Sequence, residues 1–285
     1  MYQQEITRHH RTAFVIAIDQ SLSMQKEVTF NMECMSKASA VARITDTIIN
    51  ELILRAHRDN GVRDYYDIAI LGYADNEVYP LIDKNRYFIP VAEFDSLKSA
   101  PKTYLIDRIL PDGSLHQHKE SCHTWITPKA SGNTPMYEAM MQIRELVSEW
   151  CSKPQNAESF PPIIFNITDG EASDCSPAEL IAISEQIRNL STTDGNVLLI
   201  NIHLSSGEYA PSVIFPSDDE INPDNHYIRL LADCSSIMPE QFDALIRSQR
   251  GVLAIPPFHA MSYNASLTEL IAMLNIGSRS ITNLQ

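Results

Sequence analysis

The 285-residue sequence lacks the features that mark disordered, fibrous and membrane-spanning chains. It contains only 9 glycines, with 44% hydrophobic and 20% charged residues, a balance typical of a globular protein that buries a substantial apolar core. No run of about eighteen apolar residues occurs, as a membrane-spanning helix would need. The N-terminal segment has no cationic region followed by an apolar one, the pattern of an export signal. We therefore expect a cytoplasmic protein with no membrane partner.

Positive charge is also scarce. The 22 Lys and Arg residues are outnumbered by 36 Asp and Glu, which gives a net charge of -14. Nucleic acid is bound mainly through basic side chains, so we expect no nucleic-acid partner. The five cysteines are odd in number and show no CxxC spacing, which favours reduced thiols over a disulfide framework. No G-x-S-x-G, G-x-x-x-x-G-K-[ST] or H-E-x-x-H string signals acyl transfer, nucleotide hydrolysis or metalloprotease chemistry.

The apolar residues that are present form short runs rich in β-branched side chains. Such nearly continuous runs are typical of parallel strands that are covered on both faces, and they lie at 14–18, 68–71, 163–167 and 197–202, with a weaker candidate at 251–255. Segments of helical period separate them: one at about 32–57, one opened by Thr134-Pro135 with Thr134 at the N-cap, and one opened by Ser176-Pro177. This alternation predicts an α/β fold, doubly wound and Rossmann-like, with a mostly parallel central sheet and helices on both faces.

Two stretches interrupt the alternation. Residues at about 80–131 and at about 205–237 carry scattered polar residues and no clear period. Long segments of this kind in a compact domain are either functional surfaces or simple excursions of the chain. We therefore predict a single domain over 1–285, with a core at about 13–277 and two insertions.

Oxygen-bearing side chains gather where predicted strands end. Asp19, Ser21 and Ser23 follow the first strand, and Asp169 follows the strand at 163–167. In a sheet of strand order 3-2-1-4-5-6, strands 1 and 4 are neighbours at the point where the order reverses, which is where such sheets bind ligands. Asp19 and Asp169 should then face each other. The hydroxyl of Thr134, on a third segment, could point into the same crevice.

This set of donors predicts a metal site. Few carboxylates combined with several hydroxyls suit Mg²⁺ or Mn²⁺, which prefer hard oxygen ligands and tolerate bound water. Two carboxylates leave little surplus negative charge around a divalent ion. The ion would therefore remain attractive to an incoming carboxylate, which supplies a way to bind a partner.

The three segments D-x-S-x-S, GNTPMYEA and TDG resemble, in order and spacing, the metal-ion-dependent adhesion site (MIDAS) of the von Willebrand factor A (vWA) domain family. The resemblance covers about 13–277 and implies that Ser21, Ser23 and Thr134 contact the ion directly, while Asp19 and Asp169 act largely through water. It implies a protein-binding module, not an enzyme, whose partner protein presents an acidic residue. Position 22 is Leu where the family often has Gly. The chain is also similar to intracellular bacterial stand-alone members associated with tellurite resistance or with kinase and phosphatase systems.

Three other interpretations stay open. The first is a Mg²⁺-dependent phosphohydrolase of the haloacid dehalogenase type with Asp19 as nucleophile, although that chemistry needs a general acid where Ser21 stands. In the second, the metal site is vestigial and the insertions alone bind the partner. In the third, an imidazole and thiol cluster in the first insertion binds zinc, although its spacing matches no recognised finger; it consists of His116, His118, Cys122 and His123.

Overall fold

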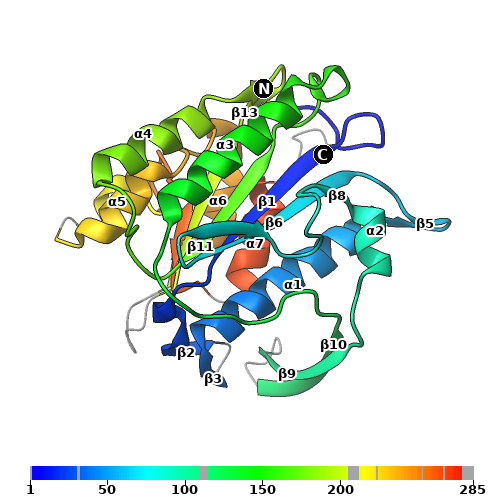
Figure 1. Ribbon diagram of the computed structural model, residues 1–285, viewed down its shortest axis with the longest axis horizontal. Coiled ribbons are helices and arrows are strands. Elements are labelled where there is room, and N and C mark those ends of the chain that lie inside the picture. The colour runs from blue at the N-terminus through cyan, green and yellow to red at the C-terminus, as the bar shows by residue number, and fades with distance from the viewer. Residues whose placement is uncertain are drawn as a thin grey trace.

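A central sheet forms the middle layer of the fold (Figure 1). The structure, a computed structural model, describes residues 2–30, 33–109, 115–204, 212–222, 224–251, 253–265 and 267–277, without the side chains of 104–120, 267 and 268. The sheet has the order β15-β16-β14-β11-β1-β6-β7, with β8 also paired to β6. Its strands are β1 (Thr12–Asp19), β6 (Tyr66–Ala74), β7 (Glu77–Pro80), β8 (Ile89–Pro90), β11 (Ile163–Thr168), β14 (Leu198–His203), β15 (Val213–Ile214) and β16 (Met261–Tyr263).

The strand pairing gives the sheet its mostly parallel character. Strand β1 pairs in parallel with both β6 and β11, β11 with β14, and β14 with β16, whereas β7, β8 and β15 are antiparallel. Taking the five parallel strands with β7, the order is 3-2-1-4-5-6, and it reverses between β1 and β11. The predicted doubly wound α/β fold is therefore confirmed. The switch point lies between the strands that end in Asp19 and Thr168.

Helices cover both faces of the sheet, as Figure 1 shows with α3 and α4 on one side and α1 and α7 on the other. Alternate residues of β1 belong to two apolar clusters on opposite faces of the sheet. Phe14 and Ile16 belong to the cluster on the face covered by α1, and Val15 and Ala17 to the cluster on the face covered by α3 and α4. This double burial explains why the strand reads as a continuous apolar run. The helices are α1 (Lys37–Ala56), α2 (Val91–Ser96), α3 (Met136–Ser152), α4 (Pro177–Arg188), α5 (His226–Cys234), α6 (Asp243–Arg250) and α7 (Leu267–Gly277). In the described part of the chain, no helix is long and apolar enough to cross a membrane.

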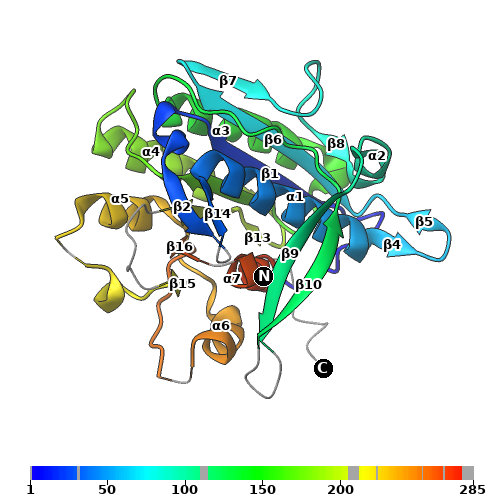
Figure 2. The same ribbon diagram turned by 90° about the horizontal axis from the view of Figure 1, so that it is seen from below.

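Both stretches that were interpreted as insertions contain ordered elements. Residues 80–131 hold β8, α2 and a hairpin of β9 (Lys102–Ile109) and β10 (Leu115–Cys122). Figure 2 shows this hairpin as a ribbon that leaves the body of the fold beside α1. Within 205–237, the first residues to 211 lie outside the described residues, and the remainder contains β15, α5 and the short helix η3 (Asp218–Glu220).

Three predictions of where helices begin have clear outcomes, one confirmed and two corrected. Helix α4 begins at Pro177 with Ser176 as its cap, as predicted. Helix α1 begins later than predicted because a hairpin precedes it, formed by β2 (Glu27–Phe30) and β3 (Glu33–Ser36). Residue Pro135, not Thr134, is the N-cap of α3, and its carbonyl accepts a bond from the Ala139 amide.

The weaker strand candidate at 251–255 is wrong. Gly251, with φ of 102°, ends α6 in a backbone conformation that favours glycine. The described residues of the candidate that follow it, 253–255, belong to no strand, and Leu253 is 89% exposed. The strand that extends this edge of the sheet is β16 instead. Apolar character alone did not separate an exposed loop from a short strand.

Candidate functional site

The first strand delivers Asp19 to the carboxyl edge of the sheet. Its side chain is buried, and both carboxylate oxygens are engaged. Oδ1 accepts a 2.8 Å bond from the backbone amide of Ser21, and Oδ2 accepts a 2.8 Å bond from the hydroxyl of Thr168 at the end of β11. Burial raises the pKa of Asp19, while these hydrogen bonds act in the opposite direction. Asp19 thus fixes the loop that follows it and links it to the neighbouring strand.

The two serines connect Asp19 to Asp169. The Ser21 and Ser23 hydroxyl oxygens lie 2.9 Å apart. The Ser23 hydroxyl donates a 2.5 Å bond to Oδ1 of Asp169, which follows β11 directly. Because β1 and β11 are adjacent parallel strands, their carboxyl ends place these side chains together. The predicted juxtaposition of Asp19, Ser21, Ser23 and Asp169 is what the structure shows.

Thr134 lies on the third segment, next to the other two. Its residue is buried, and its backbone exchanges two 3.0 Å bonds with Ser173, one to the hydroxyl and one from the amide. The segment 131–134 is tied to the loop after β1, because the Leu22 amide donates to Gly132 O at 3.0 Å and the Ser131 amide to Gln20 O at 2.8 Å. Among its described contacts, Thr134 contributes backbone groups. Its hydroxyl as a metal ligand stays a prediction.

A buried lysine also belongs to this cluster, and the sequence reasoning missed it. The ammonium of Lys37 lies 2.7 Å from Oδ2 of Asp169, and the two side chains are only 2% and 1% exposed. Lys37 is the first residue of α1. A cation at a helix N-terminus is disfavoured by the helix macrodipole. Because the helix was predicted to begin at about 32, Lys37 was not expected at a helix start, and no feature of the sequence signalled its carboxylate partner.

Two rings close the side of the cluster that faces β14. His203 ends β14 opposite Thr168, and burial, followed by the nearby Lys37 ammonium, lowers its pKa to about 4. Its Nδ1 is buried without a hydrogen-bond partner among the described residues. The Tyr227 ring packs edge-on against His203 at 5.2 Å, and its hydroxyl donates to Gly170 O. The imidazole is therefore neutral near pH 7 and leaves Lys37 as the cation of the cluster.

A buried polar network crosses the sheet from β6 to the second insertion. The Tyr73 hydroxyl donates to the side-chain oxygen Oδ1 of Asn166, and the side-chain amide of Asn166 donates to Oδ1 of Asn201. The side-chain amide of Asn201 donates in turn to the Ser235 hydroxyl, and each of these three bonds is 2.9 Å long. In the strand register Asn166 is opposite Ala17 and Tyr73 is opposite Asp19, so the contact between Tyr73 and Asn166 crosses β1 diagonally. The network connects β6, β11 and β14 to the segment that follows α5.

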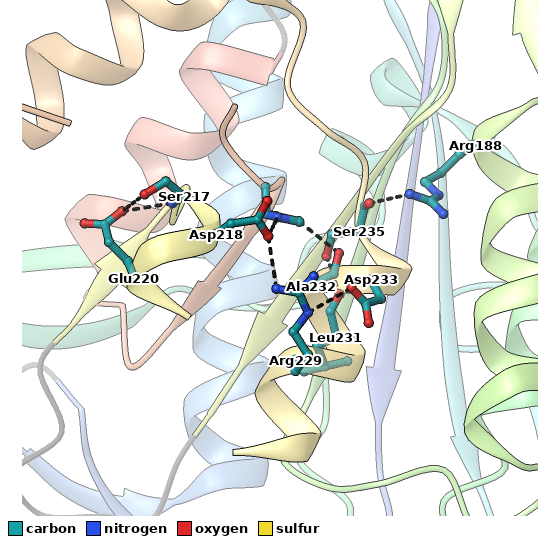
Figure 3. Close-up of polar contacts among 10 residues, drawn as sticks. Arg188, Ser217, Asp218, Glu220, Arg229, Leu231, Ala232, Asp233 and Ser235 are labelled. Atoms are coloured by element: carbon teal, nitrogen blue, oxygen red, sulfur yellow. Dashed lines mark hydrogen bonds and ion pairs between the residues drawn. The ribbon is translucent and has the colours of Figure 1, made fainter. Parts of the chain in front are cut away.

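A second charged cluster, drawn in Figure 3, includes Asp218 and Arg229, whose side chains are 54% and 43% exposed. Asp218 accepts a 3.0 Å bond from Arg229 and faces Nε2 of His259 at 3.1 Å. The other ring nitrogen of His259 lies 3.1 Å from Ala232 O, and Arg229 also pairs with Asp233 at 3.2 Å. This cluster connects η3, α5 and the loop before β16, so its contacts are accounted for by the fold.

The first cluster offers oxygen donors that fit a small divalent ion. An octahedral Mg²⁺ at about 2.1 Å from each oxygen spaces neighbouring ligands about 3.0 Å apart, and the Ser21 and Ser23 oxygens are 2.9 Å apart. Within the described residues, no group of three or more His, Cys, Asp or Glu side chains is arranged to hold a metal. A metal in this cluster would therefore depend on hydroxyl donors beside its two carboxylates.

The same geometry bears on the phosphohydrolase interpretation. A nucleophilic carboxylate needs a free oxygen that can reach the phosphorus, but both oxygens of Asp19 accept hydrogen bonds within a buried cluster. The position of the general acid holds Ser21, whose hydroxyl faces Ser23. A hydroxyl cannot protonate a leaving group at neutral pH. This arrangement does not favour that reaction.

The zinc interpretation falls partly outside what the structure describes, since the side chains of His116 and His118 are among those left out. The other two members have different neighbours. Cys122 accepts a 2.6 Å bond from the Asn50 amide, and Nδ1 of His123 lies 2.9 Å from Ser99 O. These contacts attach the base of the β9–β10 hairpin to the body of the fold.

No protein-family model matches the chain, and no curated protein matches it. Solved structures do match. A von Willebrand factor type A protein from Catenulispora acidiphila is 14% identical, with a TM-score of 0.41 over 68% of this chain and 33% of that chain. The vWF domain of the type V pili tip protein Mfa5 from Porphyromonas gingivalis is 11% identical, with a TM-score of 0.45 over 97% of each chain.

The three N-terminal domains of Mfa5 match with 12% identity and a TM-score of 0.34, over 89% of this chain and 38% of that chain. This chain spans only about a third of the length of the Catenulispora structure described above. The fold assignment rests on the strand order, and the site on the contacts given above.

Proposed function

We propose that this chain is a protein-binding module in which a Mg²⁺ or Mn²⁺ ion, held by Asp19, Ser21, Ser23, Thr134 and Asp169, binds an acidic side chain of a partner protein. The observation that carries the proposal is the pair of Ser21 and Ser23 hydroxyls 2.9 Å apart. The Ser23 hydroxyl donates to Asp169 and the Ser21 amide donates to Asp19, so the pair lies between the carboxylates at the ends of two adjacent strands. This group lies at the switch point of the sheet, where doubly wound folds bind ligands.

The charges of the cluster support binding of an anionic group. Asp19 and Asp169 contribute two negative charges and Lys37 one positive charge, within a region shielded from solvent. A divalent ion would give the site a net positive charge, which in such surroundings attracts a carboxylate more strongly than it would in water. Beside the site, Leu22 exposes 55% of its surface and would give a bound partner an apolar contact.

Binding is favoured over catalysis by the engagement of Asp19 described above. Reduced thiols suit a cytoplasmic setting for this interaction.

The test is capture of a partner from the native cytosol by the immobilised protein, with and without EDTA. We expect EDTA to abolish capture, added Mg²⁺ to restore it, and Asp19→Ala to prevent it, because the substitution removes the group that holds the Ser21 loop. Asp95→Ala, which removes an exposed carboxylate on α2 paired with Lys98, is the control and should capture normally. Capture that ignores both EDTA and Asp19→Ala would refute the proposal and favour binding by the insertions alone.

A further inference from the structure

Lys37 is an unusual residue for the interior of a protein. Lysine is almost never fully buried unless it is paired, because transfer of its charge from water is costly. Here the side chain is 2% exposed and its ammonium lies 2.7 Å from Asp169, a carboxylate that is itself 1% exposed. Replacing a buried ion pair with apolar residues is often neutral or stabilising. Stability alone therefore does not account for this pair.

The two oxygens of Asp169 have different partners. Oδ1 accepts the bond from the Ser23 hydroxyl, and Oδ2 accepts the bond from the Lys37 ammonium. One carboxylate is thus shared between the serines that would hold a metal and a cation supplied by α1. Two positive charges on the same carboxylate repel each other, and the repulsion is strong where water is excluded.

We propose that Lys37 is a built-in cation of this site, which neutralises Asp169 when no metal is bound and lowers the affinity of the site for the divalent ion. This inference rests on the proposed metal site. Its consequence is a coupling between the two ligands. A partner carboxylate adds the negative charge that the ammonium cancels, so the ion and the partner should each bind more tightly in the presence of the other.

The experiment is calorimetric titration of Mg²⁺ into the full chain and three variants. Lys37→Met removes the charge and the hydrogen-bond donor, whereas Lys37→Gln removes the charge and keeps a donor, so it carries the test if the Met variant fails to fold. Lys98→Met removes an equal charge from the pair that Lys98, which follows α2, forms with Asp95. We expect Mg²⁺ to bind both Lys37 variants about tenfold or more tightly than the wild type, and Lys98→Met to match the wild type. Added Mg²⁺ should also raise the melting temperature of the Lys37 variants more than that of the wild type.

The pattern of results separates this inference from the proposed function. If the wild type binds Mg²⁺ and the Lys37 variants bind it equally or more weakly, the inference is wrong and the metal site stands. If only the Lys37 variants bind Mg²⁺, the inference is supported and the metal-dependent function of the natural chain is refuted. If none of the proteins binds Mg²⁺, both are refuted.

Discussion

The clusters around Asp169 and around Asp218 both join a carboxylate to a basic side chain, and the two ion pairs differ chiefly in burial. In the first, Lys37 and Asp169 are 2% and 1% exposed. In the second, Asp218 and Arg229 are 54% and 43% exposed. Exposed pairs contribute little to stability because water and salt screen them, whereas a buried charge that loses its partner is very unfavourable. The fold keeps the buried ion pair of Lys37 and Asp169 at the switch point of the sheet, where we place a ligand site.

The largest effect is expected at Asp169. The variant Asp169→Ala leaves the Lys37 ammonium buried without its partner, and we expect a loss of about 3 to 5 kcal/mol in the free energy of unfolding. Urea denaturation monitored by circular dichroism measures this loss. The matched variant Asp218→Ala breaks the exposed cluster and should cost under about 1 kcal/mol. Equal losses in the two variants would remove the contrast between the clusters.

A third carboxylate shows what burial does when backbone amides are the main partners. Asp46 on α1 accepts bonds of 2.8 and 3.0 Å from the amides of Trp125 and Ile126, and burial raises its pKa from 3.8 to about 6. Because the folded pKa is the higher one, the contribution to stability is fully present below pH 3.8 and is lost as the pH rises through 6. The shift corresponds to at most about 3 kcal/mol.

We therefore expect Asp46→Asn to flatten the change in stability between pH 4 and pH 7, since the amide keeps an acceptor oxygen and does not ionise. Thermal unfolding of both proteins across this range is the measurement. Parallel curves for the variant and the wild type would show that burial does not control this carboxylate.

A smaller effect is expected in the uncharged network that crosses the sheet. Asn201→Ala leaves donors and acceptors of Asn166 and Ser235 unpaired in the interior, which should cost about 2 to 3 kcal/mol. Since Asn201 and Ser235 are hydrogen-bonded to each other, the single variants and the double variant with Ser235→Ala should be non-additive. Urea unfolding of all three checks this. Strict additivity would mean that the two side chains act independently.

The smallest effect is expected at the surface. Arg229→Ala removes contacts to Asp218 and Asp233, and we expect a loss of under about 1 kcal/mol that shrinks further at about 0.5 M salt. Chemical unfolding at low and high salt measures both. A loss as large as that of Asp169→Ala, unaffected by salt, would show that exposure is a poor guide to the energy of these pairs.

Much of the fold was predictable because parallel strands leave a strong local signal. The runs that became β1, β6, β11 and β14 are buried on both faces, so their apolar character is nearly continuous. The order of these strands then placed Asp19 beside Asp169. The edge of the sheet was harder to predict, because β15 and β16 contain only two and three residues.

The site was predictable only in part. Asp19, Ser21, Ser23 and Asp169 could be brought together because each lies next to a strand end. Lys37 could not, because its contact with Asp169 spans 132 positions in the sequence and depends on how α1 meets the sheet. The helix was predicted to begin at about 32, so Lys37 was not expected in its first turn either. The segment that holds Thr134 lies next to the loop after β1, as predicted, but the N-cap of α3 is Pro135 and not Thr134.

The most direct test of the central claim is Mn²⁺ binding measured by electron paramagnetic resonance, in which free hexaaqua Mn²⁺ gives the signal. Titration of the wild-type protein should reduce the free signal to a stoichiometry of one ion per chain, and added Mg²⁺ should release the Mn²⁺. The double variant Ser21→Ala and Ser23→Ala, which removes the hydroxyl pair and keeps both carboxylates, should leave the ion free. Identical binding curves for the two proteins, or no binding by the wild type, would contradict the account.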